Sequence, residues 1–343
     1  MDHDQHHPDP APVADPSGSH DMGDMGGMHG GLTESPSAST LLEWMAPEPW
    51  VAALLIVLSV GYGAGLLTLR GQGIAWPWYR TLAWAAGVAS LALMTATGIA
   101  GYGMVLFSVH MGQHMMLSMV TPVLLLAGAP VTLLLRALPR RSPGRRAWHY
   151  LPRTALLHVL HSKILAVATH PLVGSALFVG SLYGLYFTPL LNNAMSSQLG
   201  HALMLCHFVL VGLVFFGPVL AVDPWPHRSP AGVRLFQVIL AVPFHAFFAI
   251  AVMQASMPLS TVFASSTRSL GMDPIQDQYV GGSIAWVFGE VPIILIGLIL
   301  FVQWVRDDAR QSRRLDRQAE RDGDARLLAY NAALGRLGDR DRP

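Results

Sequence analysis

Seven apolar stretches, each long enough to cross a membrane as a helix, constrain the fold of this chain more than any other feature. A helix needs about 20 mostly apolar residues to span roughly 30 Å of hydrocarbon. We place the stretches at residues 48–69, 81–100, 108–135, 164–187, 199–221, 232–256 and 284–305. The glycines and prolines inside several of them are tolerated where neighbouring helices satisfy the backbone. The sequence therefore predicts an all-α polytopic membrane protein, a bundle of seven transmembrane helices.

The composition agrees with lipid as the solvent for most of the chain. Hydrophobic residues make up 52% of the 343 residues and charged residues only 13%. A soluble domain of this length would carry more charge on its surface. The formal net charge of +1 gives no basis for nucleic-acid binding, and the single cysteine excludes a disulfide within the chain.

The distribution of basic residues predicts the orientation. With the N-terminus outside the cytoplasm, all of the 22 Lys and Arg residues except Arg268 fall in or beside a predicted cytoplasmic loop, or in the C-terminal tail. The opposite orientation would violate the positive-inside rule. Residues 1–40 lack the pattern of a cleavable signal peptide. We expect three regions: a disordered extracytoplasmic tail (1–44), a transmembrane domain (45–305) and a charged, partly helical cytoplasmic tail (306–343).

The N-terminal tail contains a histidine- and methionine-rich segment, HDMGDMGGMHGG. Imidazole and thioether ligands together suit copper, and methionine favours Cu(I). The glycines would leave the segment free to wrap around an ion. The alternative is a polar low-complexity tail without a ligand. The residues expected to capture copper are His20, Met22, Met25, Met28 and His29.

The third apolar stretch begins with a pair of histidines at helical spacing. His110 and His114 are four residues apart, so both side chains project from one face of a helix. Met111 and Met115 lie beside them. Because histidine in hydrocarbon is costly, it usually faces a partner, a cavity or a metal. We predict that this pair binds a metal ion at the outer mouth of the bundle.

Further side chains capable of binding metal occupy the outer halves of the fifth, sixth and seventh stretches. They are His201, Met204, Cys206, His207, His245 and Glu290. Six residues correspond to about 240° of helical rotation, so His201 and His207 would form successive stations rather than one site. The alternative is that these groups only hydrogen-bond neighbouring helices. Taken together, the set indicates a metal or haem site.

Five segments, in order along the chain, resemble a known family. They are HMGQHMMLSMVTPVLLLAGAP (110–130), HPL (170–172), HALMLCHFVLVGLVFFGPVLAVDP (201–224), PFHAFFAIAVM (243–253) and DQYVGGSIAWVFGEVP (277–292). The chain resembles the multi-span CtaG-type cytochrome c oxidase assembly factors of Gram-positive bacteria. The resemblance implies a seven-helix protein needed to build active haem–copper oxidase, thought to work through copper. It also implies functional positions at His110, Gln113, His114, His207, His245, Asp277, Gln278, Trp286 and Glu290.

The expected function is that of a copper-handling assembly factor, not an enzyme, in a bacterial plasma membrane. Copper, as Cu(I), would pass from the tail to His110 and His114, and then to the deeper ligands. The expected partners are cytochrome c oxidase subunits and the lipid bilayer, without nucleic acid. Two alternatives remain open: a copper importer or permease, which needs ligands continuing to the cytoplasmic side, and a b-type haem protein with bis-histidine ligation.

Overall fold

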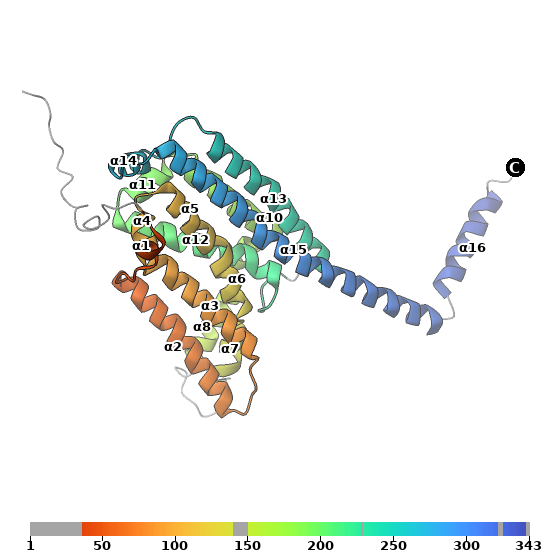
Figure 1. Ribbon diagram of the computed structural model, residues 1–343. Helices are drawn as coiled ribbons and strands as arrows, with labels where there is room; N and C mark the ends of the chain where they lie inside the picture. The colour runs from red at the N-terminus through yellow and green to blue at the C-terminus, as the bar shows by residue number, and fades with distance from the viewer. Residues whose placement is uncertain (1–35, 140–149, 228, 322–324, 341–343) are drawn as a thin grey trace, which may run out of the picture.

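Helices account for nearly all regular structure in the computed structural model, which describes residues 36–139, 150–227, 229–321 and 325–340. Within these ranges the only β contact is an isolated bridge between Trp44 and Thr97. Successive long helices run in alternating directions and pack side by side (Figure 1). The predicted all-α class is confirmed.

Five helices among the described residues are long and apolar enough to cross a membrane. They are Pro49–Gly71 (α2), Phe107–Ala137 (α5 to α7), Gln198–Leu220 (α12), Ala231–Gln254 (α13) and Pro274–Arg321 (α15). The other two predicted stretches form shorter helices, Trp78–Thr95 (α3) and Lys163–Ala168 (α9) followed by Pro171–Tyr186 (α10). The chain is therefore a multi-pass membrane protein, whereas the count of seven spans and the orientation stay predictions.

Short helices close one end of the bundle, which we call the capped end (Figure 1). They are Ala38–Leu42 (α1), Gly98–Tyr102 (α4), Leu190–Met195 (α11) and Thr261–Ser269 (α14). Ser37, Thr97 and Ser260 accept backbone N–H groups at the starts of α1, α4 and α14, the usual role of hydroxyl side chains at a helix N-terminus. The opposite end, where α7 (Pro130–Ala137) ends and α8 (Leu151–Leu160) lies, carries arginines, and we call it the basic end.

The third predicted stretch is interrupted rather than one regular helix. It consists of α5 (Phe107–Met115), a π-helical turn (Met116–Val120, η1), α6 (Thr121–Ala127) and α7. Pro122 has no N–H to donate to the carbonyl of Ser118. Gly212 of α12 approaches that carbonyl so closely that a Cβ atom would lie 2.2 Å from the oxygen. Such turns are rare and often occur at functional sites, and this one begins two residues after His114.

The last long helix extends well beyond the predicted stretch of 284–305. It begins at Pro274, a residue suited to a first helical position, and continues through the charged sequence to Arg321. Alternating Asp and Arg residues support helix in that part, as in the ion pair between Asp307 and Arg310 at 3.3 Å. After residues 322–324 a final helix follows, Ala325–Arg340 (α16).

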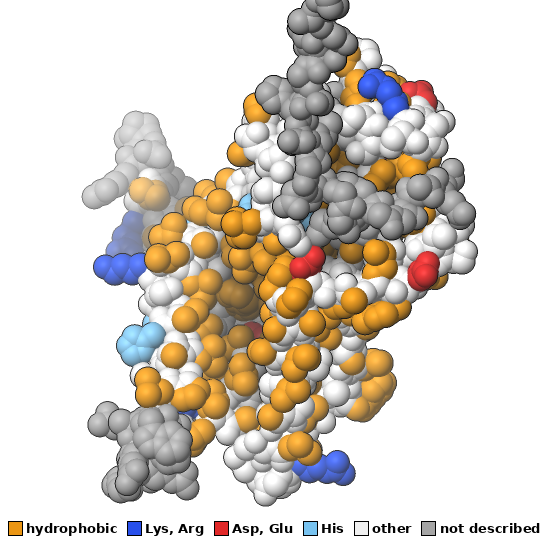
Figure 2. All heavy atoms as spheres, turned by 90° about the vertical axis from the view of Figure 1, so that its left-hand side faces the viewer, with side chains coloured by type: hydrophobic (Ala, Val, Ile, Leu, Met, Phe, Trp, Pro, Cys, Tyr) orange, Lys and Arg blue, Asp and Glu red, His pale blue; other side chains and the backbone are white. Residues whose placement is uncertain are grey.

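The surface of the bundle is apolar, as expected for helices facing lipid. Figure 2 shows hydrophobic side chains across most of the face that lies on the left in Figure 1, with charged side chains at only a few places. α2 illustrates the pattern, since Ile56, Val60 and Leu67 are each more than half exposed. The interior contains a continuous core that includes the stacked rings of Phe178 and Phe215.

Candidate functional site

The two histidines of α5 share one helical face, as predicted. The His110 ring lies 6.1 Å from the Phe208 ring and 6.0 Å from the Tyr186 ring, measured between centroids. The His114 ring contacts the same two residues, at 4.0 Å and 5.4 Å. Both imidazoles therefore point inward between α5, α10 and α12.

His114 is held in a defined orientation. Its Nδ1 atom lies 2.9 Å from the Tyr186 hydroxyl, and its ring stacks on Phe208 with an interplanar angle of 17°. The hydrogen bond at Nδ1 leaves Nε2 as the nitrogen available to an additional ligand. A histidine ligand commonly uses its second nitrogen in such an orienting bond, so the arrangement suits metal coordination through Nε2.

His110 is completely enclosed, and neither of its ring nitrogens makes a hydrogen bond of good geometry with a described residue, although the backbone of Gly103 lies close enough to interact with the ring. Its closest aromatic neighbour is Phe263 of α14, at 5.1 Å between centroids. This differs from the sequence-based expectation that His110 lies at the mouth of the bundle, because α14 covers it. A buried polar group without a partner costs about 1–3 kcal/mol, which makes both nitrogens candidates for a ligand.

A cavity of about 210 Å³ opens at the capped end, and we call it the vestibule. It is lined by the first turns of α2 and α12 together with α4, and His201 forms part of its wall. His201 is 8% exposed, and its Nε2 atom has no partner among the described residues. Met45, Met104 and Glu48 also line the vestibule. Sequence reasoning missed these three because they lie outside the histidine-bearing helices.

His245 lies at a tight contact between α13 and α15. A Cβ atom on Gly289 would come within 2.1 Å of the imidazole Cδ2 atom, so only glycine leaves room for the ring. The Nε2 atom of His245 is buried without a partner among the described residues. His245 and His114 together line a cavity of about 10 Å³, near the lower limit for one water molecule.

The buried histidines form a series that starts at the vestibule. His201 is close enough to His110 to interact with it electrostatically. His114 is similarly close to His110, and also to His245 and His207. The order from the vestibule is therefore His201, His110, His114, and His245 beyond it. Sequence spacing alone did not establish this order, because the residues come from three helices.

The remaining predicted site residues differ in how deeply they are buried. Met111, Met115 and Met204 are buried in the core, Cys206 is half-buried, and His207 lies on an exposed face of α12. Glu290 is half-buried and makes no hydrogen bond or ion pair with any described residue. The predicted tail ligands His20, Met22, Met25, Met28 and His29 lie outside the described residues. Within the described ranges, no three His, Cys, Asp or Glu side chains converge on one point.

Three polar residues in the resembling segments have structural contacts instead. Asp277, in the first turn of α15, accepts the backbone N–H of Phe107 at 2.7 Å and so caps α5. Gln278 accepts the Leu259 N–H at 2.7 Å and donates to the Val252 carbonyl at 3.2 Å. Gln113 donates to the Met94 carbonyl at 2.6 Å. These bonds fix the ends of the helices that carry His110, His114 and His245.

Comparison with known proteins places this arrangement in a family. A family model described as cytochrome c oxidase caa3 assembly factor (Caa3_CtaG) matches residues 60–307. An uncharacterized protein of Mycobacterium bovis is 40% identical over 315 residues, which cover 89% of this chain and 46% of the relative. An uncharacterized protein of Mycobacterium leprae is 41% identical over 289 residues, covering 84% and 43%.

The chain spans less than half the length of these curated relatives, and no solved structure matches it significantly. The family match extends from α2 to the end of the transmembrane part of α15 and includes every buried histidine of the series. The chain therefore belongs to the cytochrome c oxidase caa3 assembly factor family.

Proposed function

We propose that this protein receives Cu(I) at the vestibule, binds it between the buried histidines, and delivers it to an oxidase subunit docked in the membrane. The observation that carries the proposal is the row of imidazole nitrogens without partners, on His201, His110 and His245. The family membership gives the acceptor, since an assembly factor for cytochrome c oxidase acts on an enzyme that contains copper.

The vestibule supplies the first ligands in this proposal. Met45 and Met104 bring two thioethers to the same cavity as His201, and soft sulfur ligands favour Cu(I) over harder divalent ions. Glu48 also lines the cavity and accepts a hydrogen bond from Gln198 at 2.7 Å. The His- and Met-rich segment of the tail would bring copper to this opening.

The inner histidines supply the second station. His110 offers ring nitrogens without a hydrogen bond of good geometry among the described residues, and His114 offers Nε2 while Tyr186 holds its Nδ1. The described residues contain no cluster of three His, Cys, Asp or Glu side chains. Low ligand numbers with neutral imidazoles suit a carrier, because the ion must leave again. A closed site with four ligands is typical of structural metals.

The structure favours delivery on one side of the membrane over copper import. Beyond His114 and His245, towards the basic end, the next layer consists of the mutually packed rings of Phe178, Phe215 and Phe216. These side chains offer no ligand to a metal ion. An import path would have to continue through this layer to reach His170 and His227, which pack together at 5.5 Å between ring centroids.

The haem alternative does not fit the space between the histidines. Pockets for large organic ligands usually measure about 300–1,000 Å³. The cavity shared by His114 and His245 has only about 10 Å³. A porphyrin held by these two residues would require the helices to separate.

Copper binding by the purified full chain tests the proposal. After anaerobic loading with Cu(I) and desalting, metal analysis should show a lower copper content in a His110→Ala, His114→Ala variant than in the parent chain. The matched control is His158→Ala, His161→Ala, which removes two exposed histidines of the basic end whose Nδ1 atoms contact backbone carbonyls.

Two further measurements separate the parts of the proposal. A chain lacking residues 1–31 should keep the copper that depends on His110 and His114. Oxidase activity in membranes of a host lacking the chromosomal gene should return with the parent chain and not with the His110→Ala, His114→Ala variant. Equal copper content in the double variant and its control would reject the inner site.

A further inference from the structure

Another cavity lies at the basic end, apart from the series of buried histidines. It measures about 530 Å³ and lies between α7, α8, the start of α13 and the segment that follows α12. Arg136, Arg153 and Arg234 line it, together with Asp223 and Thr132. None of these residues takes part in the site described above, so the cavity requires a separate explanation.

The one carboxylate of this cavity is already engaged. Asp223 is 5% exposed and accepts the backbone N–H of Thr132 at 2.7 Å, the Thr132 hydroxyl at 2.6 Å and the Val131 N–H at 3.3 Å. It thereby caps the N-terminus of α7. The three guanidinium groups remain in excess over this single negative charge, so the wall of the cavity is positively charged.

Arg153 and Arg234 also cap helix C-termini, but this uses only part of their hydrogen-bonding capacity. Arg153 donates to the carbonyls of Leu135 and Leu138 at the end of α7. Arg234 donates to the Val219 carbonyl of α12 at 2.9 Å and to the Gln303 side chain at 3.3 Å. A guanidinium has five N–H donors, and the buried Nε of Arg234 has no partner among the described residues.

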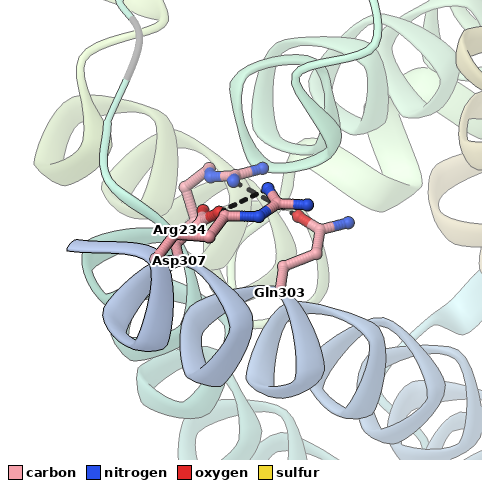
Figure 3. Close-up of polar contacts among 4 residues, drawn as sticks. Arg234, Gln303 and Asp307 are labelled. Atoms are coloured by element: carbon pink, nitrogen blue, oxygen red, sulfur yellow. Dashed lines mark hydrogen bonds and ion pairs between the residues drawn. The ribbon is translucent and has the colours of Figure 1, made fainter. Parts of the chain in front are cut away.

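One acidic group of α15, Asp307, lies near enough to Arg234 to attract it electrostatically, but it does not line the cavity. Figure 3 shows Arg234 beside Gln303 and Asp307. Asp307 forms its ion pair with Arg310, at 3.3 Å. Arg136 lies over the Trp76 ring, with its guanidinium carbon 5.8 Å from the ring centroid, and makes no ion pair with a described residue. An anion between the three arginines would satisfy these donors and reduce their mutual repulsion.

Apolar side chains border the charged wall. Val222 lines the cavity itself, and Leu151 and Val233 are exposed close in sequence to Arg153 and Arg234. A soluble anion would gain nothing from these groups, whereas a lipid would place acyl chains along them and its phosphate among the arginines. In the orientation predicted from the sequence, this end faces the cytoplasmic leaflet, where anionic lipids attract basic residues.

We propose that this cavity binds the phosphate headgroup of an anionic membrane lipid, held by Arg136, Arg153 and Arg234. Arginine suits this role because its planar fork of donors matches phosphate oxygens in pairs. The bound lipid would join α7, α8 and α13 at the basic end, independently of any metal at the capped end.

Lipid retention by the full chain tests the proposal. Detergent-purified protein is mixed with phosphatidylglycerol or with phosphatidylcholine of the same chain length, and bound lipid is counted by native mass spectrometry. The parent chain should retain phosphatidylglycerol at least fivefold better. Arg136→Gln should lower that retention by about tenfold to a hundredfold, the loss expected for a charge-assisted contact. The matched control is Arg70→Gln, an exposed arginine at the same end that does not line the cavity.

An additional variant and folding controls complete the experiment. Arg136→Lys keeps the charge but loses the paired donors, and it should fall between the parent and Arg136→Gln. Thermal unfolding and gel filtration show that each variant is folded. Equal retention of the two lipids, or an equal effect of Arg70→Gln and Arg136→Gln, would overturn the proposal. So would displacement of the lipid by millimolar inorganic phosphate, which would identify a site for free phosphate.

Discussion

The Nδ1 atom of His114 and the hydroxyl of Tyr186 lie 2.9 Å apart, with their rings tilted by only 13° from parallel. The bond joins α5 to the last turn of α10 and fixes the imidazole within the bundle. Because this hydrogen bond occupies Nδ1, Nε2 is the His114 nitrogen left to bind a ligand. This relationship yields the first prediction.

Replacing Tyr186 with phenylalanine should weaken Cu(I) binding by about tenfold to a hundredfold, because loss of an orienting hydrogen bond on a ligand histidine has effects of that size. Competition with a chromophoric Cu(I) chelator measures the change. Tyr183→Phe is the control, since that hydroxyl donates to the Phe244 carbonyl and not to a histidine. Equal affinities for the two variants would show that Tyr186 does not orient a copper ligand.

Gly289→Ala should displace His245. The added methyl group would lie 2.1 Å from the ring, so the imidazole or α15 must move. Overpacking of this kind costs about 1–3 kcal/mol of stability. We expect both a lower unfolding temperature and a lower copper content, measured on the same purified sample. Gly297→Ala, whose Cβ would meet its nearest neighbour at 4.0 Å, should change neither quantity.

Asp277→Ala should destabilise the protein by removing the cap of α5. The carboxylate accepts the N–H of Phe107, and loss of such a cap costs about 0.5–2 kcal/mol. Thermal unfolding in detergent should show the decrease. Asp308→Ala, on the exposed part of α15, should leave the unfolding temperature within error of the parent. A loss of copper binding without any loss of stability would instead assign Asp277 a direct part in the metal site.

Gly212→Ala tests the contact between α12 and the π-helical turn. Its Cβ would lie 2.2 Å from the Ser118 carbonyl oxygen, so the two helices must separate. We expect a loss of about 1–3 kcal/mol, read from thermal unfolding. Gly180→Ala, where no atom lies within 4 Å of the added carbon, should be neutral or slightly stabilising. Similar unfolding temperatures for both variants would contradict the close approach.

Features that depend on a single helix could be predicted from the sequence. The four-residue spacing of His110 and His114 predicted their common face, because helical periodicity alone determines it. The vestibule could not be predicted in this way. Met45, Met104 and His201 are far apart in the chain, and only the packing of α2, α4 and α12 brings them to one cavity.

Long-range hydrogen bonds explain the other differences. The family resemblance implied a functional position at Asp277, but its partner is the N–H of Phe107, 170 residues earlier. The early start of α15 follows from the same contact, because the bond forms from the first turn of a helix. The π-helical turn likewise depends on Gly212 of another helix, so the apolar pattern of 108–135 contained no sign of it.

α15 joins the exposed charged residues of the chain to the tight helix contact at His245. Its 48 residues extend for about 72 Å, and nearly all side chains from Phe301 to Arg321 are exposed. Gly289, against which the His245 ring lies, is about 48 Å from Arg321 along the same helix. Because one unbroken helix covers this distance, the charged arm and the contact at His245 belong to a single rod rather than to separate units.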